Sequence, residues 1–488
     1  MSSAIVIGAG IGGIASAIRL ANKGYDVDVF EANTSPGGKL NEIRLGSYRF
    51  DAGPSLFTMP ELVDELFRLA GKDPKQYFRY ERVSEICRYF YEDETEITAH
   101  ADPLDFAREV EDKLGVPAKK VLKHLGKSDY IYRSTAHLFL ERSLHRLSSY
   151  LRFETLRSFL KLPFLWIDRS MHEANEKALK DARLVQLFDR YATYNGSDPY
   201  QAPGTLHIIP HLEFNKGAFF PEGGMYSITR SLYQLAEDLG VRFHFNTPVK
   251  RIAVRGRKAS GVLADKEYHA HKIVCNMDVG FAYRKLLPDQ KHPSRILEQE
   301  RSSSALIFYW GIAKSFPKLL LHNIFFSADY QEEFKDIFKN KKFSLDPTVY
   351  VHISSKMNED DAPKGKENWF VMINVSSDQG QDWDTLIPKA RAAILKKLSR
   401  MLKEDIEPLI EEEDILEPRT IESRTSSYKG ALYGTASNKK MAAFFRHSNF
   451  SSEIDNLYFT GGSVHPGGGI PLALSSAKIV DSLILHEK

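Results

Sequence analysis

The stretch AIVIGAGIGGIASAIRLANKGYDVDVFEA, residues 4–32, determines how this chain begins to fold. Its first four residues are all apolar, which predicts a short strand buried on both faces. A glycine-rich turn follows, then residues 14–23 are typical of a helix, and Gly24 is placed to end it. Valines alternate with acidic residues over 26–31, which predicts a second strand. This strand–turn–helix–strand order is typical of a Rossmann-like parallel sheet.

The turn matches the pattern G-x-G-x-x-G at Gly8, Gly10 and Gly13. The first glycine permits a tight turn, the second lets backbone approach a pyrophosphate, and the third lets the helix pack close to the strand. Free N–H groups at the helix start favour an anion. Glu31 lies 18 residues after Gly13, placed to accept hydrogen bonds from ribose hydroxyls and to repel the 2′-phosphate of NADP.

These residues predict a dinucleotide site, but they do not separate NAD from FAD. The alternative is a turn that merely packs a helix on a sheet, which would explain the glycines but not the acid. The predicted contacts in this part of the chain are Gly8, Gly10, Ile11, Gly12, Gly13, Glu31 and Ala32.

Length and composition limit the number of domains and the classes of partner that this chain can have. The chain has 488 residues with 42% hydrophobic and 27% charged, enough for two or three domains, and its net charge of +2 gives no reason to expect a nucleic-acid partner. Two cysteines exclude a disulfide framework, and no H-E-x-x-H or C-x-x-C motif predicts a metal. The first strand begins almost at the N-terminus, so we expect no signal peptide and a cytoplasmic protein. The most apolar stretch, 305–313, is too short to span a membrane and predicts a buried strand.

A second glycine-rich region follows the first at 33–60. Backbone at its paired glycines could pass a flavin's phosphates or ribityl chain, with the lysine adding charge, and an enzyme that uses only NAD has no evident need for it. Taken alone, each piece is also compatible with an ordinary loop turn. The predicted contacts here are Gly37, Gly38, Lys39, Gly53, Pro54 and Ser55.

Two distant segments predict further strands of the same sheet, at 241–249 and 272–278. Val249 could offer its backbone to an adenine edge, and Asn276 and Met277 could lie near the adenosine half. Spacing leaves open that both are core strands without ligand contact.

The C-terminal segment 456–480 predicts a strand at 457–459, two glycine turns and a helix opened by Pro471. With Gly469 and Ile470, this helix start could stabilise negative charge at the pyrimidine end of a reduced isoalloxazine. Gly462 completes the predicted contacts. The segment favours FAD spread across the domain, and its alternative is a glycine-rich terminal turn.

Together these segments resemble the bacterial phytoene-desaturase type of carotenoid desaturase, within the flavin amine-oxidase superfamily. The motifs are GAGIGGIASAIRLANKGYDVDVFE, SPGGK, YRFDAGPSLFTMP, GAFFPEGGM and GGSVHPGGGIPLALSSAK. The resemblance implies an α/β fold, with a Rossmann-like FAD-binding domain of the glutathione-reductase/amine-oxidase type and a discontinuous α+β substrate domain. Lys39 replaces the family's frequent arginine, which keeps the charge but loses the bidentate fork. Gly461-Gly462-Ser463 stands where many relatives carry an aspartate.

Within that family, DAGPSLFTMPELVDELF and RYATYNGSDPYQAPG are more similar to the hydroxycarotenoid 3,4-desaturases. The resemblance implies C-3,4 desaturation of a 1-hydroxylated acyclic end of a carotene, as in myxol or saproxanthin pathways. A phytoene desaturase is the nearest alternative. An FAD amine or porphyrinogen oxidase and a non-catalytic carotenoid carrier are more distant ones.

We expect the FAD-binding domain to comprise 1–75, 220–290 and 430–488. A substrate and membrane-contacting region then comprises 76–219, mostly helical, and 291–429, with strands at 305–313 and 368–375 and a helix at 386–403. The acidic run 404–414 is interpreted as a solvated face or linker.

A carotene is almost insoluble in water, so we expect peripheral membrane association. Residues 142–167 combine five cations and one acid with an apolar stripe, which is typical of a membrane-surface helix or of an amphipathic helix packed on the core. Phe219, Phe220 and Tyr194 could line a substrate tunnel, although core packing is the simpler role. We assign no catalytic acid or base from the sequence, and the sequence does not identify the electron acceptor.

Overall fold

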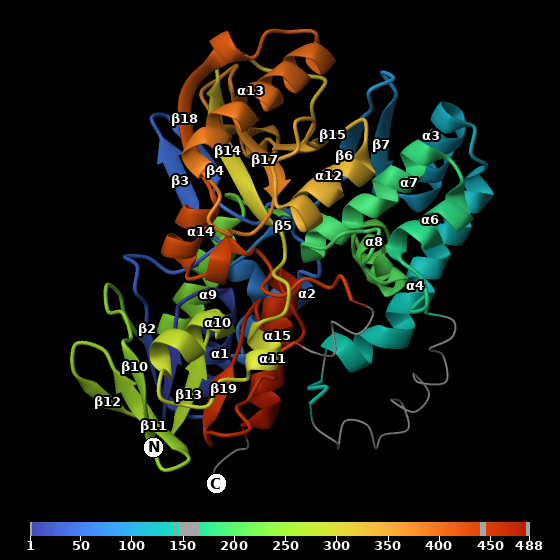
Figure 1. Ribbon diagram of the computed structural model, residues 1–488. Coiled ribbons are helices and arrows are strands. Elements are labelled where there is room, and N and C mark those ends of the chain that lie inside the picture. The colour runs from blue at the N-terminus through green and yellow to red at the C-terminus, as the bar shows by residue number, and fades with distance from the viewer. Residues whose placement is uncertain (1, 141, 146–164, 440–445, 485–488) are drawn as a thin grey trace.

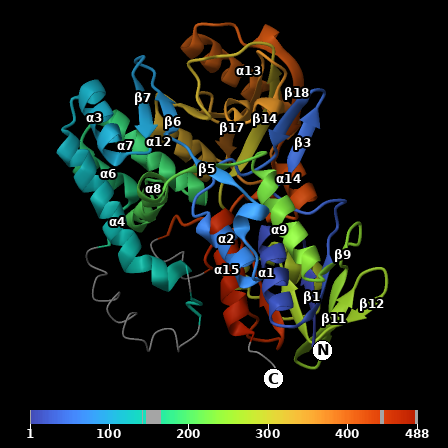
Figure 2. The same cartoon turned by 180° about the vertical axis from the view of Figure 1, so that it is seen from behind.

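The computed structural model describes residues 2–140, 142–145, 165–439 and 446–484. In Figure 1 the lower part holds a parallel sheet with its helices, the upper part a second sheet with α13 (Trp383–Leu402), and a helical layer lies to the right. Figure 2 shows the same three regions from behind, with the described parts of both chain ends at the bottom. This α/β architecture confirms the predicted fold class.

The parallel sheet has the strand order β19-β13-β1-β2-β9. Its strands come from segments far apart in the sequence: β1 (Ser3–Ile7), β2 (Asp26–Phe30), β9 (Arg242–His244), β13 (Lys272–Cys275) and β19 (Leu457–Phe459). Each lies where a strand was predicted, although β9 covers only the first part of 241–249. The glycine turn at 8–13 therefore sits in the middle of the sheet, at the carboxyl end of β1.

Alternation along β1 explains its burial on both faces. Ala4 and Val6 pack into a core with α1 (Ile11–Asn22), α2 (Glu61–Leu69), α9 (Tyr226–Asp238) and α15 (Ile470–Leu483). Ile5 and Ile7 pack into a separate core on the other face. That face is covered by a three-stranded sheet of β10 (Arg251–Arg255), β11 (Lys258–Leu263) and β12 (Glu267–His269).

The second sheet has seven strands in the order β18-β14-β17-β16-β15-β6-β7. They are β6 (Glu85–Phe90), β7 (Glu96–His100), β14 (Ser304–Ile312), β15 (His322–Phe325), β16 (Val349–His352), β17 (Glu367–Val375) and β18 (Ile410–Leu416). The predicted strands at 305–313 and 368–375 are confirmed as β14 and β17, which pair antiparallel along their whole length. On β14, Phe308 and Trp310 pack towards α13, whereas Ile307 and Tyr309 face the opposite side.

The structure adds strands to two segments that were not expected to contribute them to this sheet. The acidic run 404–414 is not only a solvated face or linker, because its second half enters β18, which pairs with β14 at the edge of the sheet. An edge strand with one solvent-exposed side accommodates its glutamates. The mostly helical segment 76–219 also contributes β6 and β7 to the far side of the sheet.

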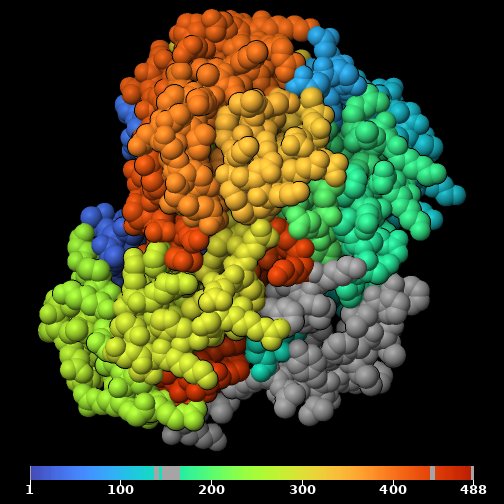
Figure 3. Space-filling view, viewed as in Figure 1, coloured from blue at the N-terminus to red at the C-terminus, as the bar shows by residue number. Residues whose placement is uncertain are grey.

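The helical layer is formed by α3 (Pro103–Leu114), α4 (Ala118–Leu140), α6 (Met171–Leu179), α7 (Ala182–Asp189) and α8 (Ile208–His211). Shorter elements join the layers: α10 (Val279–Phe281), α11 (Ser294–Leu297), α12 (Tyr330–Lys335) and α14 (Pro418–Thr425). The β3 (Glu42–Leu45)–β4 (Tyr48–Asp51) hairpin and the antiparallel pair of β5 (Tyr80–Arg82) with the distant β8 (Phe219–Pro221) form two further small sheets. In the space-filling view the orange upper region, the green helical layer and the yellow-green lower region meet on the face shown (Figure 3). The domain boundaries assigned from the sequence stay a prediction.

Candidate active site

A cavity of about 820 Å³ runs between the parallel sheet and the seven-stranded sheet. Of the residues predicted to contact a dinucleotide, all but Gly13 line it. They are Gly8, Gly10, Ile11, Gly12, Glu31, Ala32, Gly37, Gly38, Lys39, Gly53, Pro54, Ser55, Val249, Asn276, Met277, Gly462, Gly469, Ile470 and Pro471. The fold thus brings together five segments of the chain that extend from Gly8 to Pro471.

The start of α1 is shaped to hold an anion. Its N-cap is Gly10, which has no side chain to bond the first N–H groups, and the first turn carries no acidic residue. Glu31 is buried, and its carboxylate accepts hydrogen bonds from the Ala9 N–H at 2.7 Å and the Asn33 N–H at 2.9 Å. The acid therefore fixes the turn while lining the cavity, and its remaining lone pairs can accept from ribose hydroxyls.

The glycines of this turn have different roles. A Cβ on Gly13 would lie 2.1 Å from the carbonyl oxygen of Gly8, so Gly13 keeps the helix close to the strand and faces away from the cavity. A Cβ on Gly10 would lie 2.7 Å from Oδ1 of Asn276. Asn276 in turn donates to the carbonyl of Thr460 at 3.2 Å. Asn276 therefore joins the first and last segments of the chain at the glycine turn.

Lys39, which the sequence analysis predicted to add positive charge beside the cofactor, lines the cavity. Its ammonium donates to the carbonyl of Leu432 at 2.6 Å. Loss of hydration lowers the pKa of Lys39 to about 8, although the negative charge of Asp278 acts in the opposite direction. A lysine held by a carbonyl and lining a cavity can pair with a phosphate, provided that it is protonated.

The C-terminal part of the cavity is lined by the start of α15. The N-cap Gly469 has φ +102° and no side chain, and Pro471 lies in the first turn, where a missing N–H costs nothing. Ser463 accepts a hydrogen bond from the Val279 N–H at 3.0 Å. Its hydroxyl thus ties this loop to α10.

The other half of the cavity lies against the seven-stranded sheet and the helical layer. Its wall is largely apolar, with Ile86, Leu165, Ile167, Ile208, Ile209, Leu212, Ile307, Ile324, Phe370 and Met372. Tyr194 lines it, as the sequence analysis considered, whereas the buried Phe220 packs in the core and Phe219 packs against the core of the parallel sheet. An apolar substrate fits this wall better than a polar metabolite does.

Sequence reasoning missed a polar cluster in this apolar half: Arg190, Glu213, His322 and Tyr350 all line the cavity. Arg190 donates to the hydroxyl of Tyr194 at 2.7 Å, and Tyr194 donates to Glu213 at 3.0 Å. The four residues lie on four separate elements, and only Arg190 belongs to a motif quoted above, RYATYNGSDPYQAPG. Only the close packing of β15, β16 and the helical layer brings them together.

The residues that line the cavity are chemically suited to hold FAD. It offers a bare helix start for a pyrophosphate, a buried carboxylate for a ribose, and a second bare helix start at the other end. Among the described residues, no cluster of three or more histidine, cysteine, aspartate or glutamate side chains is arranged to hold a metal ion.

Comparison with known proteins identifies the family to which this chain belongs. A family model described as flavin containing amine oxidoreductase matches residues 11–480, so the chain belongs to this family. It is an FAD-dependent oxidoreductase.

Individual relatives of known activity are similar to this chain along most of its length. The chain is 52% identical over 485 residues to the 1-hydroxycarotenoid 3,4-desaturase of a Flavobacterium species, covering 99% of each chain. It is 31% identical over 486 residues to the zeta-carotene-forming phytoene desaturase of Myxococcus xanthus, covering 99% of this chain and 93% of the relative. Among solved structures, an oxidoreductase from Methanosarcina mazei matches with TM-score 0.65 at 13% identity, covering 97% of this chain and 98% of that one. Cyclohexylamine oxidase from Brevibacterium oxydans matches with TM-score 0.60 at 14% identity, covering 99% and 98%. These two likenesses concern the fold alone.

Proposed function

We propose that this protein is an FAD-dependent carotenoid desaturase that forms the C-3,4 double bond at a 1-hydroxylated acyclic end of a carotene. The observation that carries the proposal is the 52% identity to a 1-hydroxycarotenoid 3,4-desaturase along almost the whole of both chains. The phytoene desaturase at 31% identity is the alternative within the same family. The apolar half of the cavity supports a hydrocarbon substrate over an amine.

The predicted cofactor contacts can be assigned to separate parts of FAD. The glycine turn at 8–13, Glu31 and Lys39 would hold the pyrophosphate and ribose, and the start of α15 would lie at the pyrimidine end of the flavin. When bound, FAD supplies a hydride acceptor, while the polyene spreads the positive charge that develops on the carotene.

The protein itself positions the substrate and keeps water away from it. The apolar wall formed by β14, β17 and the helical layer excludes water and holds one carbon–carbon bond in place. Oxidation removes a hydride and a proton from neighbouring carbons, and the proton of an extended allylic cation is acidic enough to leave to a backbone carbonyl. No strong protein base is needed for that step.

We also propose that the protein takes its substrate at a membrane surface. Most of the segment 142–167 that predicts this contact lies outside the described residues. Among the described residues, no helix has the length and apolar character needed to cross a membrane. Peripheral contact is consistent with a water-insoluble substrate and the cations of that segment.

The test is anaerobic bleaching of FAD-loaded protein by liposomes that carry one carotene each. One batch holds phytoene and the other a 1-hydroxylated monocyclic carotene, with products separated by chromatography. Bleaching and a longer chromophore with the hydroxylated carotene alone are expected. Conversion of phytoene instead would place the enzyme at the start of the pathway and refute the proposed bond.

A further inference from the structure

A cluster of buried polar residues interrupts the apolar half of the cavity, and the proposed chemistry does not use it. We call it the polar wall: Arg190, Tyr194, Glu213, His322 and Tyr350, all of which line the cavity. Arg190 and Tyr194 lie in the turn that follows α7, and Glu213 lies in the turn that follows α8. His322 is on β15 and Tyr350 on the neighbouring strand β16.

The charged part of the polar wall is fully withdrawn from solvent. The side chains of Arg190 and Glu213 are 5% and 1% exposed, with 3.7 Å between the guanidinium and the carboxylate. Arg190 donates to Tyr89 at 2.8 Å, and Glu213 accepts from Tyr191 at 2.5 Å. A buried ion pair stabilises a fold little or not at all relative to apolar residues of similar size. Its presence in a hydrocarbon cavity therefore points to a task other than stability.

Two nitrogen atoms of the polar wall have no hydrogen-bond partner within the described parts of the chain. They are Nε of Arg190 and Nε2 of His322, both buried. The other ring nitrogen of His322 is paired with the Tyr350 hydroxyl at 2.8 Å, which pairs with Oγ of Ser55 at 2.7 Å. Burial, with His352 and the positive charge of Arg190, lowers the pKa of His322 far below its usual value, so the ring is neutral. A neutral ring nitrogen and a guanidinium N–H both suit a hydroxyl group.

The polar wall begins beside the segment that is predicted to contact the flavin. Ser55 directly follows Gly53 and Pro54 in the segment predicted to contact the flavin, and the pairs Ser55–Tyr350 and Tyr350–His322 extend from there. In a 1-hydroxylated carotene, C-1 is separated from C-3 by a single carbon. A group that binds the hydroxyl must therefore lie beside the bond that is oxidised. Phytoene has no polar atom to offer these nitrogens.

We propose that Arg190 and His322 bind the C-1 hydroxyl of the substrate, and that the polar wall makes the enzyme select hydroxylated carotenes over hydrocarbons. This inference rests on the proposed function. A site built to bond a hydroxyl rejects an analogue without it, because its own polar atoms then stay buried and unpaired. These residues are specificity determinants, since the hydride leaves a neighbouring carbon.

The experiment compares two carotenes that differ only at C-1, one with the hydroxyl and one with hydrogen. His322→Phe removes the unpaired nitrogen. His352→Phe is its matched control, because His352 is equally buried and its ring stacks on that of His322 at 5.1 Å, yet it is absent from the cavity wall. Tyr350→Phe is a milder second variant that removes the hydroxyl orienting His322. Each variant is checked for FAD content before kcat/KM is measured with both carotenes.

We expect the wild-type enzyme to prefer the hydroxylated carotene strongly, and His322→Phe to reduce this preference about 10- to 100-fold. The loss should fall on the hydroxylated carotene alone, and His352→Phe should keep the preference. Equal losses on both carotenes, or an equal effect of the control, would overturn the inference while leaving the proposed function intact. If His322→Phe fails to load FAD, Tyr350→Phe decides the question by the same ratio. A wild-type enzyme that converts only the carotene without the hydroxyl refutes the proposed function, and this inference with it.

Discussion

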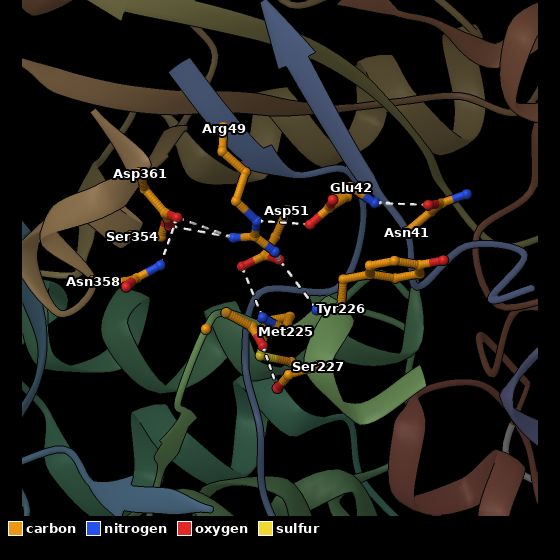
Figure 4. A network of polar contacts seen from close by, with 12 residues as sticks. Asn41, Glu42, Arg49, Asp51, Met225, Tyr226, Ser227, Ser354, Asn358 and Asp361 are labelled. Carbon is orange, nitrogen blue, oxygen red and sulfur yellow. Dashed lines mark hydrogen bonds and ion pairs between the residues drawn. The ribbon is translucent and has the colours of Figure 1, made fainter. Parts of the chain in front are cut away.

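Arg49 and Asp361 are separated by 312 positions in the sequence, yet the guanidinium of Arg49 donates to the Asp361 carboxylate at 3.2 Å (Figure 4). Arg49 also donates to Asp51 at 2.6 Å, and Asp51 accepts from the N–H groups of Met225 and Tyr226 at the start of α9. The network thus links the β3–β4 hairpin to a helix of the parallel sheet and to the turn after β16. It holds the two walls of the cavity together.

Replacing Asp361 by alanine should lower the free energy of unfolding by about 3 kcal/mol, because Arg49 would keep a buried charge with one partner fewer. The side chains of Arg49 and Asp361 are 6% and 0% exposed, so solvent does not replace the lost bond. Urea denaturation measures the change. Asp360→Ala is the control, since Asp360 is exposed and should change stability little. Equal effects of the two substitutions would contradict a structural role for the network.

Alanine at Gly13 should prevent retention of FAD, because its Cβ would lie 2.1 Å from the Gly8 carbonyl and push α1 away from β1. Alanine at Gly126 should instead stabilise the protein by about 0.5–1 kcal/mol, because a Cβ there meets nothing within 4 Å on helix α4. Flavin absorbance after gel filtration measures retention, and thermal melting measures stability. Normal flavin content in Gly13→Ala would refute the assigned packing role.

Affinity for FAD should fall as the pH rises through about 8. Below that pH Lys39 is protonated and attracts the pyrophosphate, and above it the neutral amine does not, because its pKa lies near 8. The dissociation constant should increase by up to about tenfold per pH unit beyond this point. In Lys39→Arg the side chain stays charged, so this part of the dependence should vanish. Fluorescence titrations of the apoprotein at pH 7 and pH 9 test it, and the same slope in both proteins would rule out Lys39.

Charge reversal at Arg146, Arg152 and Arg157 should abolish binding to anionic liposomes without loss of FAD. These residues belong to the predicted membrane-contacting segment, outside the described residues, and each cation near an anionic surface contributes about 1 kcal/mol. Reversal at Arg255, Lys258 and Lys266, exposed residues of the β10–β12 sheet, matches the change in net charge. Liposome co-sedimentation separates the two: an equal loss in both would indicate a net-charge effect, and unchanged binding in the first would refute the predicted contact.

The elements around the glycine turn could be predicted because their signals are local. The apolar run of β1, the glycines of its turn and the alternation in β2 specify their conformation within a few residues. The strands β13, β14, β17 and β19 carry apolar patterns of the same kind. The acidic β18 does not, because an edge strand is held by backbone pairing with β14 and keeps its glutamates in solvent.

The dinucleotide-binding start of the fold, the two further glycine-rich segments and, through resemblance, the class of chemistry could all be predicted from the amino-acid sequence. Which distant residues share one cavity became visible in the folded chain. Arg190, Glu213, His322 and Tyr350 each look like an ordinary residue of a helix, turn or strand. They form a polar wall because strand pairing sets β15 beside β16, and core packing presses the helical layer against that sheet. Contacts of this kind depend on long-range packing, which no pattern of neighbouring residues encodes.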